Sequence, residues 1–177
     1  MTLHEDAVDV LTRWPPPTEH QDRLRSQYVA HLIQRPDGLW RSCLPAHLTT
    51  GALVLSHDRR HVLLNLHRKA RRWFHFGGHL EPDDLTLAGA ALREATEESG
   101  LSGLQVDSDP LHLSTHAVEF CGSGSADHLD VRFLAVLGAD TEPQASEESL
   151  EVRWWPVDEL PTDEPGMVEM IELGRQR

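Results

Sequence analysis

The stretch from residue 77 to residue 101, GGHLEPDDLTLAGAALREATEESGL, constrains the fold of this chain most. Pro82, Asp83 and Asp84 favour the start of a helix, because proline fixes a suitable φ and carboxylates cap free N–H groups. Gly100 follows the last periodic residue and predicts a left-handed C-terminal residue. The apolar positions recur at helical spacing: Leu87, Ala88, Ala91, Leu92 and Ala95. The stretch therefore predicts a turn, a helix with one packed face, and a second turn.

Three carboxylates lie on the opposite face of this predicted helix. Glu94, Glu97 and Glu98 are spaced i, i+3 and i+4, so their side chains project from one side. Like charges at this spacing destabilise a bare helix, and a divalent cation with oxygen ligands removes the repulsion. A solvated acidic face is the alternative in so acidic a chain. The adjacent Arg93 and the flanking glycines favour a metal site.

The run REATEESGL resembles the second half of the Nudix box, G-x5-E-x7-R-E-U-x-E-E-x-G-U, where U is a bulky apolar residue. Ala95 occupies the first U position, and seven residues match the pattern: Gly78, Arg93, Glu94, Glu97, Glu98, Gly100 and Leu101. Two features differ: the segment from Gly78 to Arg93 is one residue longer, and the acidic residue between them is Asp84 instead of Glu. These departures concern the role of Asp84 and leave the helix carboxylates in register.

The resemblance implies a fold and a domain organisation. The expected fold is an α/β/α sandwich with a mixed β-sheet. A Nudix hydrolase domain would span residues 46–177, after an N-terminal helical extension over residues 1–45. The extension is expected to pack on the core or on a partner subunit, so a homodimer remains open. Two helices are predicted there, a short one ended by prolines 15–17 and a longer one over residues 19–34.

The resemblance also implies the reaction and its cofactor. It implies Mg²⁺-dependent hydrolysis, with Mn²⁺ as a substitute, of a diphosphate linkage in a nucleoside diphosphate joined to another group. Substrates of this class include nucleotide sugars, ADP-ribose and (d)NTP-type compounds. Two alternatives remain, a non-catalytic nucleotide-binding Nudix domain and an isoprenoid diphosphate isomerase on the same fold. The surroundings of Cys43 do not resemble the cysteine motif of that isomerase.

The same resemblance assigns roles within the box. Glu97, Glu98 and the carbonyl of Gly78 would hold the metal, with Glu94 close by. Arg93 would orient a motif glutamate through a salt bridge. The water-activating base is expected in the loop before the final strand, which offers Glu147, Glu148 and Glu151. We choose Glu148, and a box glutamate, Glu97 or Glu98, is the alternative.

A basic segment precedes the box in an otherwise acidic chain. Arg68, Lys69, Arg71 and Arg72 stand within five positions. We expect Arg71 and Arg72 to neutralise substrate phosphates, with a solvated loop as the alternative. Arg132, in a predicted strand with an apolar alternate face, is a candidate second phosphate contact or a surface arginine.

Composition excludes several classes of partner and site. The net charge of −13 argues against binding to nucleic acid polymers or anionic membranes, and no segment has the length of a membrane span. Cys43 and Cys121 are too few and too far apart in sequence to predict a disulfide framework or a zinc site, so we expect reduced thiols and a cytoplasmic protein. The twelve histidines are dispersed. We interpret His79, His112 and His116 as structural or substrate-lining residues and not as metal ligands.

The remaining sequence predicts mainly strands. TTGALVLS and HVLLNLH form a predicted hairpin, and LHLSTHAVEF and HLDVRFLAVLG form two more strands joined by the loop CGSGSAD. The segment EVRWWP predicts a final strand with Trp154 and Trp155. A closing helix is expected over residues 166–176.

Overall fold

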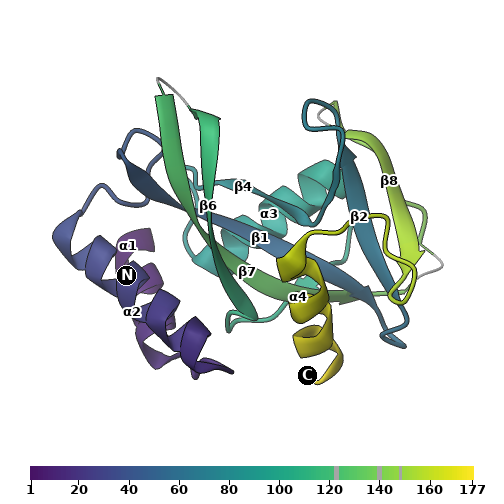
Figure 1. Cartoon of the computed structure of the whole chain (residues 1–177), viewed down its shortest axis with the longest axis horizontal. Helices are drawn as coiled ribbons and strands as arrows, with labels where there is room; N and C mark the ends of the chain where they lie inside the picture. Colours follow the sequence, from purple (N-terminus) through teal and green to yellow (C-terminus); the bar gives the residue numbers. More distant parts are fainter. Residues whose placement is uncertain (122–123, 139–140, 148) are drawn as a thin grey trace.

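A mixed sheet of eight strands forms the centre of the computed structural model, which describes residues 1–121, 124–138, 141–147 and 149–177. Within this part of the chain, helix α4 covers one face of the sheet and helix α3 the other (Figure 1). The strands are β1 (Ala46–Ser56), β2 (His61–His67), β3 (Trp73–Phe74), β4 (Phe76–His79), β5 (Gln105–Val106), β6 (His112–Cys121), β7 (Gly124–Leu137) and β8 (Ser149–Pro156). The helices are α1 (Leu3–Arg13), α2 (Glu19–Gln34), α3 (Leu87–Ser99) and α4 (Pro165–Arg175). The expected α/β class with an N-terminal helical part is confirmed.

Strand β1 organises the sheet. One edge of β1 runs parallel to β7 along its whole length, from Ala46 opposite Asp127 to Ser56 opposite Leu137. The other edge is shared by two antiparallel partners, β4 beside residues 49–52 and β2 beside residues 54–55. The sheet therefore divides along this edge of β1 into two branches, and we call this division the fork. On the fork side β2 pairs further with β3 and β8, and on the opposite side of β1 strand β7 pairs with β5 and β6.

Two apolar clusters hold the layers together. The face of the sheet below α3 contributes Ala52, Val54 and Phe133 to a cluster that also contains the apolar face of α3. The α4 face contributes Leu53, Leu55 and other residues to a second cluster. Alternate residues of β1 thus enter opposite clusters, as the pleat of a strand buried on both faces requires. No helix within the described ranges has the length and apolarity to span a membrane.

Helix α3 begins later than the sequence predicts. Its N-cap is Thr86, whose hydroxyl accepts a hydrogen bond from the Gly89 N–H at 2.9 Å. The acidic segment before it forms a separate turn instead, closed by the Glu81 N–H donating to the Asp84 carboxylate at 2.7 Å. Asp84 therefore closes this turn and does not cap the helix. Gly100 adopts the expected left-handed conformation, with φ 66°.

The N-terminal helices pack on the core through polar as well as apolar contacts. The buried Asp6 of α1 accepts a hydrogen bond from the Leu87 N–H at 2.8 Å, at the start of α3. Gln21 of α2 exchanges two hydrogen bonds with the backbone of Leu113 in β6. Tyr28 and Leu32 of α2 join the α3-side cluster. These contacts occupy the outer edge of β6 and the N-terminus of α3, so α1 supports the helix that carries the box and α2 supports the edge of the sheet.

One strand boundary and three short strands differ from the sequence-based expectation. Strand β7 begins at Gly124, so most of the expected loop between the last two long strands is β-structure. The short strands β3, β4 and β5 were not separated by the sequence pattern. The closing helix is confirmed as α4, one residue from the expected start.

Candidate functional site

Glu98 links the two branches of the fork. Its carboxylate is buried beneath α3, and Oε2 accepts hydrogen bonds from the Gly77 N–H at 3.1 Å and the Asn65 side-chain amide at 3.2 Å. Gly77 belongs to β4 and Asn65 to β2, so one side chain binds both branches. The glutamate thereby fixes the end of α3 over the gap between the strands.

Arg93 gathers the acidic residues of the loop and the helix. Its guanidinium donates in a bidentate pair to Asp84, Nε to Oδ1 at 3.0 Å and Nη2 to Oδ2 at 3.1 Å. Nη1 donates to Glu94 at 2.9 Å and to Glu97 at 3.3 Å, and Nη2 also donates to the His79 carbonyl at 3.0 Å. The hydrogen bonds that Arg93 donates to Asp84, together with the charge of Glu94, raise the pKa of Arg93 above its usual range, against the effect of burial. Asp84 thus lies against Arg93 and not against the helix N-terminus.

The first glycine of the box, Gly78, lies directly under Glu94. A methyl group on Gly78 would stand 2.7 Å from Glu94 Oε2, so a residue with a side chain at this position would displace the carboxylate. Burial raises the pKa of Glu94, whose side chain is 14% exposed, while the Glu97 side chain is 61% exposed. The three glutamates therefore place hard oxygen donors along one side of α3, and their exposure rises from the buried Glu98 to the exposed Glu97. Glu94 lies beside the backbone of Gly78. This donor set suits Mg²⁺.

Two of the predicted phosphate-binding arginines line an open cavity of about 620 Å³. Its walls are Leu66, Arg71, Arg72, Trp73 and residues 160–163. Leu66 follows Asn65 but faces the other side of its strand, and Trp73 and Leu160 pack against the α4-side cluster, so the cavity opens on the α4 side of the sheet. Arg72 Nη2 lies 3.3 Å from Asp163 across the cavity, in an exposed pair. Arg71 has φ 56°, a left-handed conformation that is unfavourable for a residue with a side chain.

Arg132, the candidate second phosphate contact, lies elsewhere, and the alternative of a surface arginine is wrong. Its side chain is 2% exposed, with Nε donating to Asp130 at 2.7 Å and Nη2 facing Glu164 at 3.5 Å. Burial alone would raise the pKa of Asp130, but Arg132 holds that pKa well below its usual range. The alternation of β7 suggested one exposed face, whereas α4 covers the face on which Arg132 lies, with Gly166 against its guanidinium. Arg132 is therefore an internal ion-pair partner and does not reach the cavity.

The predicted general base cannot be placed. Glu148 lies outside the described residues. The carbonyl of Glu147 accepts a hydrogen bond from Arg68 Nε at 2.8 Å, and Glu151 stands within β8 opposite Leu66, with its carboxylate 3.9 Å from Arg153. Arg68 thus ties the loop before β8 to the basic segment, which the sequence did not indicate.

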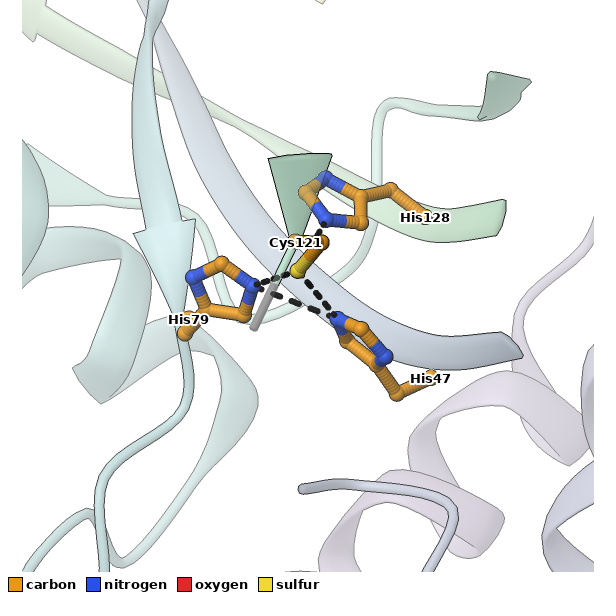
Figure 2. A group of neighbouring side chains, drawn as sticks. All are labelled: His47, His79, Cys121 and His128. Carbon is orange, nitrogen blue, oxygen red and sulfur yellow. Dashed lines mark hydrogen bonds between the residues drawn. The ribbon is translucent and has the colours of Figure 1, made fainter. Parts of the chain in front are cut away.

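The structure brings together a second group of polar side chains, which the sequence pattern did not predict. His47, His79, Cys121 and His128 point toward one another (Figure 2), and one donor atom of each lies within 4.8 Å of the others. We call these four residues the His/Cys cluster. These residues are dispersed in the sequence, but strand pairing brings them together: His47 lies directly opposite His128 in the parallel β1–β7 pair. Burial lowers the pKa of His79 and of His128 to about 4 and also lowers that of His47, so all three are neutral at pH 7.

Comparison with known proteins gives one family and a consistent fold. A family model described as the NUDIX domain matches residues 45–174. Among solved structures, an Ap4A hydrolase binary complex from C. elegans is similar with a TM-score of 0.57 at 20% identity, over 71% of this chain and 93% of that one. A MutT protein from Methanosarcina mazei Go1 has a TM-score of 0.56 at 19% identity, over 73% and 93%. The NUDIX domain of Shewanella oneidensis NrtR, complexed with ADP ribose, has a TM-score of 0.52 at 20% identity, over 71% and 85%. No curated protein sequence matches.

Proposed function

The chain belongs to the NUDIX family, and from this premise we propose that it is a Mg²⁺-dependent pyrophosphohydrolase acting on a nucleoside diphosphate joined to another group. The observation that carries the proposal is the arrangement of Glu94, Glu97 and Glu98 beside Gly78 at the fork of the sheet. All the box carboxylates that the reaction needs are present on one side of α3. A domain that only binds nucleotide has no need for this complete set.

The residues present fit Mg²⁺. Their donors are carboxylate and carbonyl oxygens, and the absence of a Cβ at Gly78 leaves room for the Glu94 carboxylate beside the backbone. Glu97, Glu98 and the Gly78 carbonyl would hold the ion, with Glu94 close by, and Mn²⁺ would serve as a substitute. When bound, the ion neutralises charge on phosphoryl oxygens and lowers the pKa of a bound water.

Other side chains of this chain have separate tasks. Arg93 orients Glu94 and Glu97, and Asp84 holds Arg93 in place through two parallel hydrogen bonds. Arg71 and Arg72 bind substrate phosphates at the open cavity that they line, because a guanidinium matches the geometry of a phosphate. A carboxylate takes the proton from the attacking water. We assign this role to Glu148, with a box glutamate as the alternative.

The substrate class is narrowed by chemistry and by the structural neighbours. Two arginines at an open cavity suit a dianionic or more highly charged diphosphate. The neighbours include an Ap4A hydrolase and a domain that binds ADP ribose, so dinucleoside polyphosphates and ADP-ribose are the first compounds to assay. Nucleotide sugars, NADH and oxidised dNTPs complete the panel.

The test is hydrolysis of this panel by the full-length chain with and without Mg²⁺, with isopentenyl diphosphate included. Products are separated by anion-exchange chromatography, and reaction in ¹⁸O-labelled water shows which phosphorus is attacked. We expect turnover of at least one nucleotide, dependent on Mg²⁺ and absent in Glu97→Gln. Saturable binding without turnover would instead identify a nucleotide-binding domain. Isomerisation of isopentenyl diphosphate without release of phosphate would identify the isomerase.

A further inference from the structure

The His/Cys cluster has the dimensions of a tetrahedral metal site. His79 Nε2 lies 3.2 Å from His47 Nε2, and Cys121 Sγ lies 3.5, 3.4 and 3.3 Å from the Nε2 atoms of His47, His79 and His128 (Figure 2). With Zn–N bonds of about 2.0–2.1 Å and Zn–S bonds of about 2.3 Å, tetrahedral geometry separates two nitrogens by about 3.3 Å and sulfur from nitrogen by about 3.5 Å. The four measured separations agree with these values.

Hydrogen bonding among the four side chains does not account for the arrangement equally well. A thiol has one proton, so Cys121 can donate to only one of the three imidazoles that surround its sulfur. His47 Nδ1 lies 3.1 Å from the Cys43 carbonyl, and donation to that oxygen leaves a lone pair on Nε2, which faces the centre of the cluster. A backbone carbonyl that fixes the tautomer in this way is a usual outer partner of a metal-binding histidine.

The four residues come from four adjacent strands, so the backbone holds them in place. His47 lies on β1, His79 at the end of β4, His128 on β7 and Cys121 at the end of β6. His47 and Cys121 are buried, and His79 and His128 are half-buried. A register shift between Val118 and Cys121 changes the pairing of β6 with β7 just before the cysteine. Such irregularities commonly redirect a side chain.

We propose that the His/Cys cluster is a structural Zn²⁺ site, distinct from the carboxylates that hold Mg²⁺. Three imidazoles and one thiolate form a nitrogen and sulfur donor set, which favours zinc over magnesium. With four protein ligands the tetrahedral shell is closed, and this is typical of a structural site and not of a catalytic one. Binding deprotonates the Cys121 thiol and releases one proton to solvent.

The site would support the box without taking part in hydrolysis. His79 directly follows Gly78, and its backbone carbonyl accepts a hydrogen bond from Arg93 at 3.0 Å. The imidazole of the same residue faces the His/Cys cluster. A metal held there would fix the end of β4 to β1, β6 and β7, and with it the carbonyl that receives Arg93.

Cobalt spectroscopy on the full-length chain tests the proposal. The protein is stripped with a chelator, kept reduced with a phosphine and titrated with Co²⁺. We expect one ion per chain to produce the intense visible absorption of tetrahedral cobalt, together with a near-ultraviolet thiolate charge-transfer band. Zn²⁺ should abolish both signals and excess Mg²⁺ should not. Zinc at a hundredfold of its Kd should also raise Tm by about 5–10 °C.

Matched variants identify the ligands. Cys121→Ser should lose the charge-transfer band, whereas Cys43→Ser, which replaces the other buried thiol, should keep it. His128→Asn should weaken cobalt binding roughly a hundredfold or more, since even outer partners of metal ligands affect affinity by about 10–100-fold. His57→Asn, at an exposed histidine outside the cluster, should bind normally.

The unmutated chain decides the question even if a variant fails to fold. A folded wild-type protein without a thiolate band at cobalt saturation would overturn the proposal. It would also be overturned if the band survived in Cys121→Ser, or if Mg²⁺ competed for the bound cobalt. Loss of cobalt binding in Glu97→Gln would place the ion at the box carboxylates instead.

Discussion

Single residues at the fork show how neighbouring carboxylates acquire different tasks. Glu98 is buried and bound by two N–H donors from separate strands, whereas Glu97 is exposed and touches only Arg93 among the contacts described. The exposed carboxylate can change partners at little cost, and the buried one holds the strands in place. We therefore expect substitutions at the two positions to separate catalysis from stability.

Replacing Glu97 with Gln should lower kcat by about two orders of magnitude or more, as expected when a group that stabilises transition-state charge is lost. Because Glu97 is exposed and makes no core contact, Tm should change by only a few degrees. Steady-state kinetics at saturating Mg²⁺, with Tm measured on the same sample, provide the check. Glu98→Gln is the comparison: its loss of activity should come with lower stability, because Glu98 binds both branches. Near-normal turnover in Glu97→Gln would remove this residue from the metal site.

Replacing Arg71 with Gly should raise KM more than it lowers kcat, since a phosphate contact in the ground state is mostly uniform binding. The same change should stabilise the fold by about 1 kcal/mol, because glycine relieves the left-handed conformation at φ 56°. Arg59→Gly is the matched control, since Arg59 has φ 60° and hydrogen-bonds the carbonyl of Arg177 instead of lining the cavity. It should show the stability gain with unaltered kinetics. Unaltered KM in Arg71→Gly would support a solvated loop.

Replacing Gly78 with Ala should displace the Glu94 carboxylate, which lies where the new methyl group would stand. Because the end of a flexible side chain moves more easily than a strand, the fold should persist. The Mg²⁺ concentration for half-maximal activity should rise roughly ten- to a hundredfold, the usual effect of disturbing a group beside the metal ligands. Gly124→Ala, at a strand position with open space around it, should leave the Mg²⁺ dependence unchanged. The same dependence in both variants would contradict the assignment.

At the scale of elements, helix α3 depends on a residue far from it in sequence. Its first backbone N–H donates to the Asp6 carboxylate of α1, and its third, that of Gly89, donates to the Thr86 hydroxyl. A negative charge at a helix N-terminus also interacts favourably with the positive end of the helix dipole. The helix that carries the metal-binding carboxylates is therefore capped from the N-terminal extension.

Replacing Asp6 with Ala should reduce the free energy of unfolding by about 1–2 kcal/mol, the usual effect of losing a helix cap with its charge. Asp6→Asn keeps a hydrogen-bond acceptor and should lose less. Urea unfolding followed by circular dichroism measures the difference. Asp9→Asn provides the control, because Asp9 lies on the same helix in an exposed pair with Arg13 and should change stability by less than about 0.5 kcal/mol. Equal losses at both positions would show that the cap contributes nothing specific.

The sequence correctly predicted features that depend on residues nearby in the chain. It did not predict features that depend on the pairing and packing of distant elements. The carboxylates of α3 follow from helical spacing, and α2 was predicted at its observed limits, residues 19–34. The start of α3 was missed because Pro82 and Asp84 carry helix-start chemistry that the chain uses for a turn and for Arg93. The His/Cys cluster depends on the register of β1 with β7, and the burial of Arg132 on the position of α4. Neither can be read from local periodicity.

At the scale of the whole molecule, the N-terminal helices and the sheet share one core. Leu11, Trp14 and Tyr28 belong to the same apolar cluster as Phe76 and Phe133. The side-chain amide of Gln21 also occupies backbone groups of β6, at the strand edge where unpaired groups would otherwise invite association with other chains. The extension thus covers surface that the sheet cannot leave exposed.

A chain that begins at residue 38 should therefore fail to fold as a monomer, although it keeps every box residue. Removal of α1 and α2 exposes the apolar cluster and leaves the Leu113 backbone and the Leu87 N–H without their partners. We expect aggregation, or a loss of the cooperative thermal transition, measured by light scattering and circular dichroism. A shorter truncation at residue 3 keeps both helices nearly whole and serves as the control. Cooperative unfolding of the longer truncation near the wild-type Tm would mean that residues 46–177 fold independently.

The parallel pairing of β1 with β7 sets an order of events during synthesis. Partners in this pair are separated by 81 residues, as the Thr49–Asp130 hydrogen bond shows. At a translation rate of about 5–20 residues per second, β1 leaves the ribosome about 4–16 s before β7. Throughout that interval β1 lacks the strand that pairs with it along its whole length, and helix α4, which covers one of its faces, emerges later still. The nascent chain is thus most vulnerable to aggregation in the interval before β7 emerges, and slowing translation between β4 and β7 would prolong that exposure.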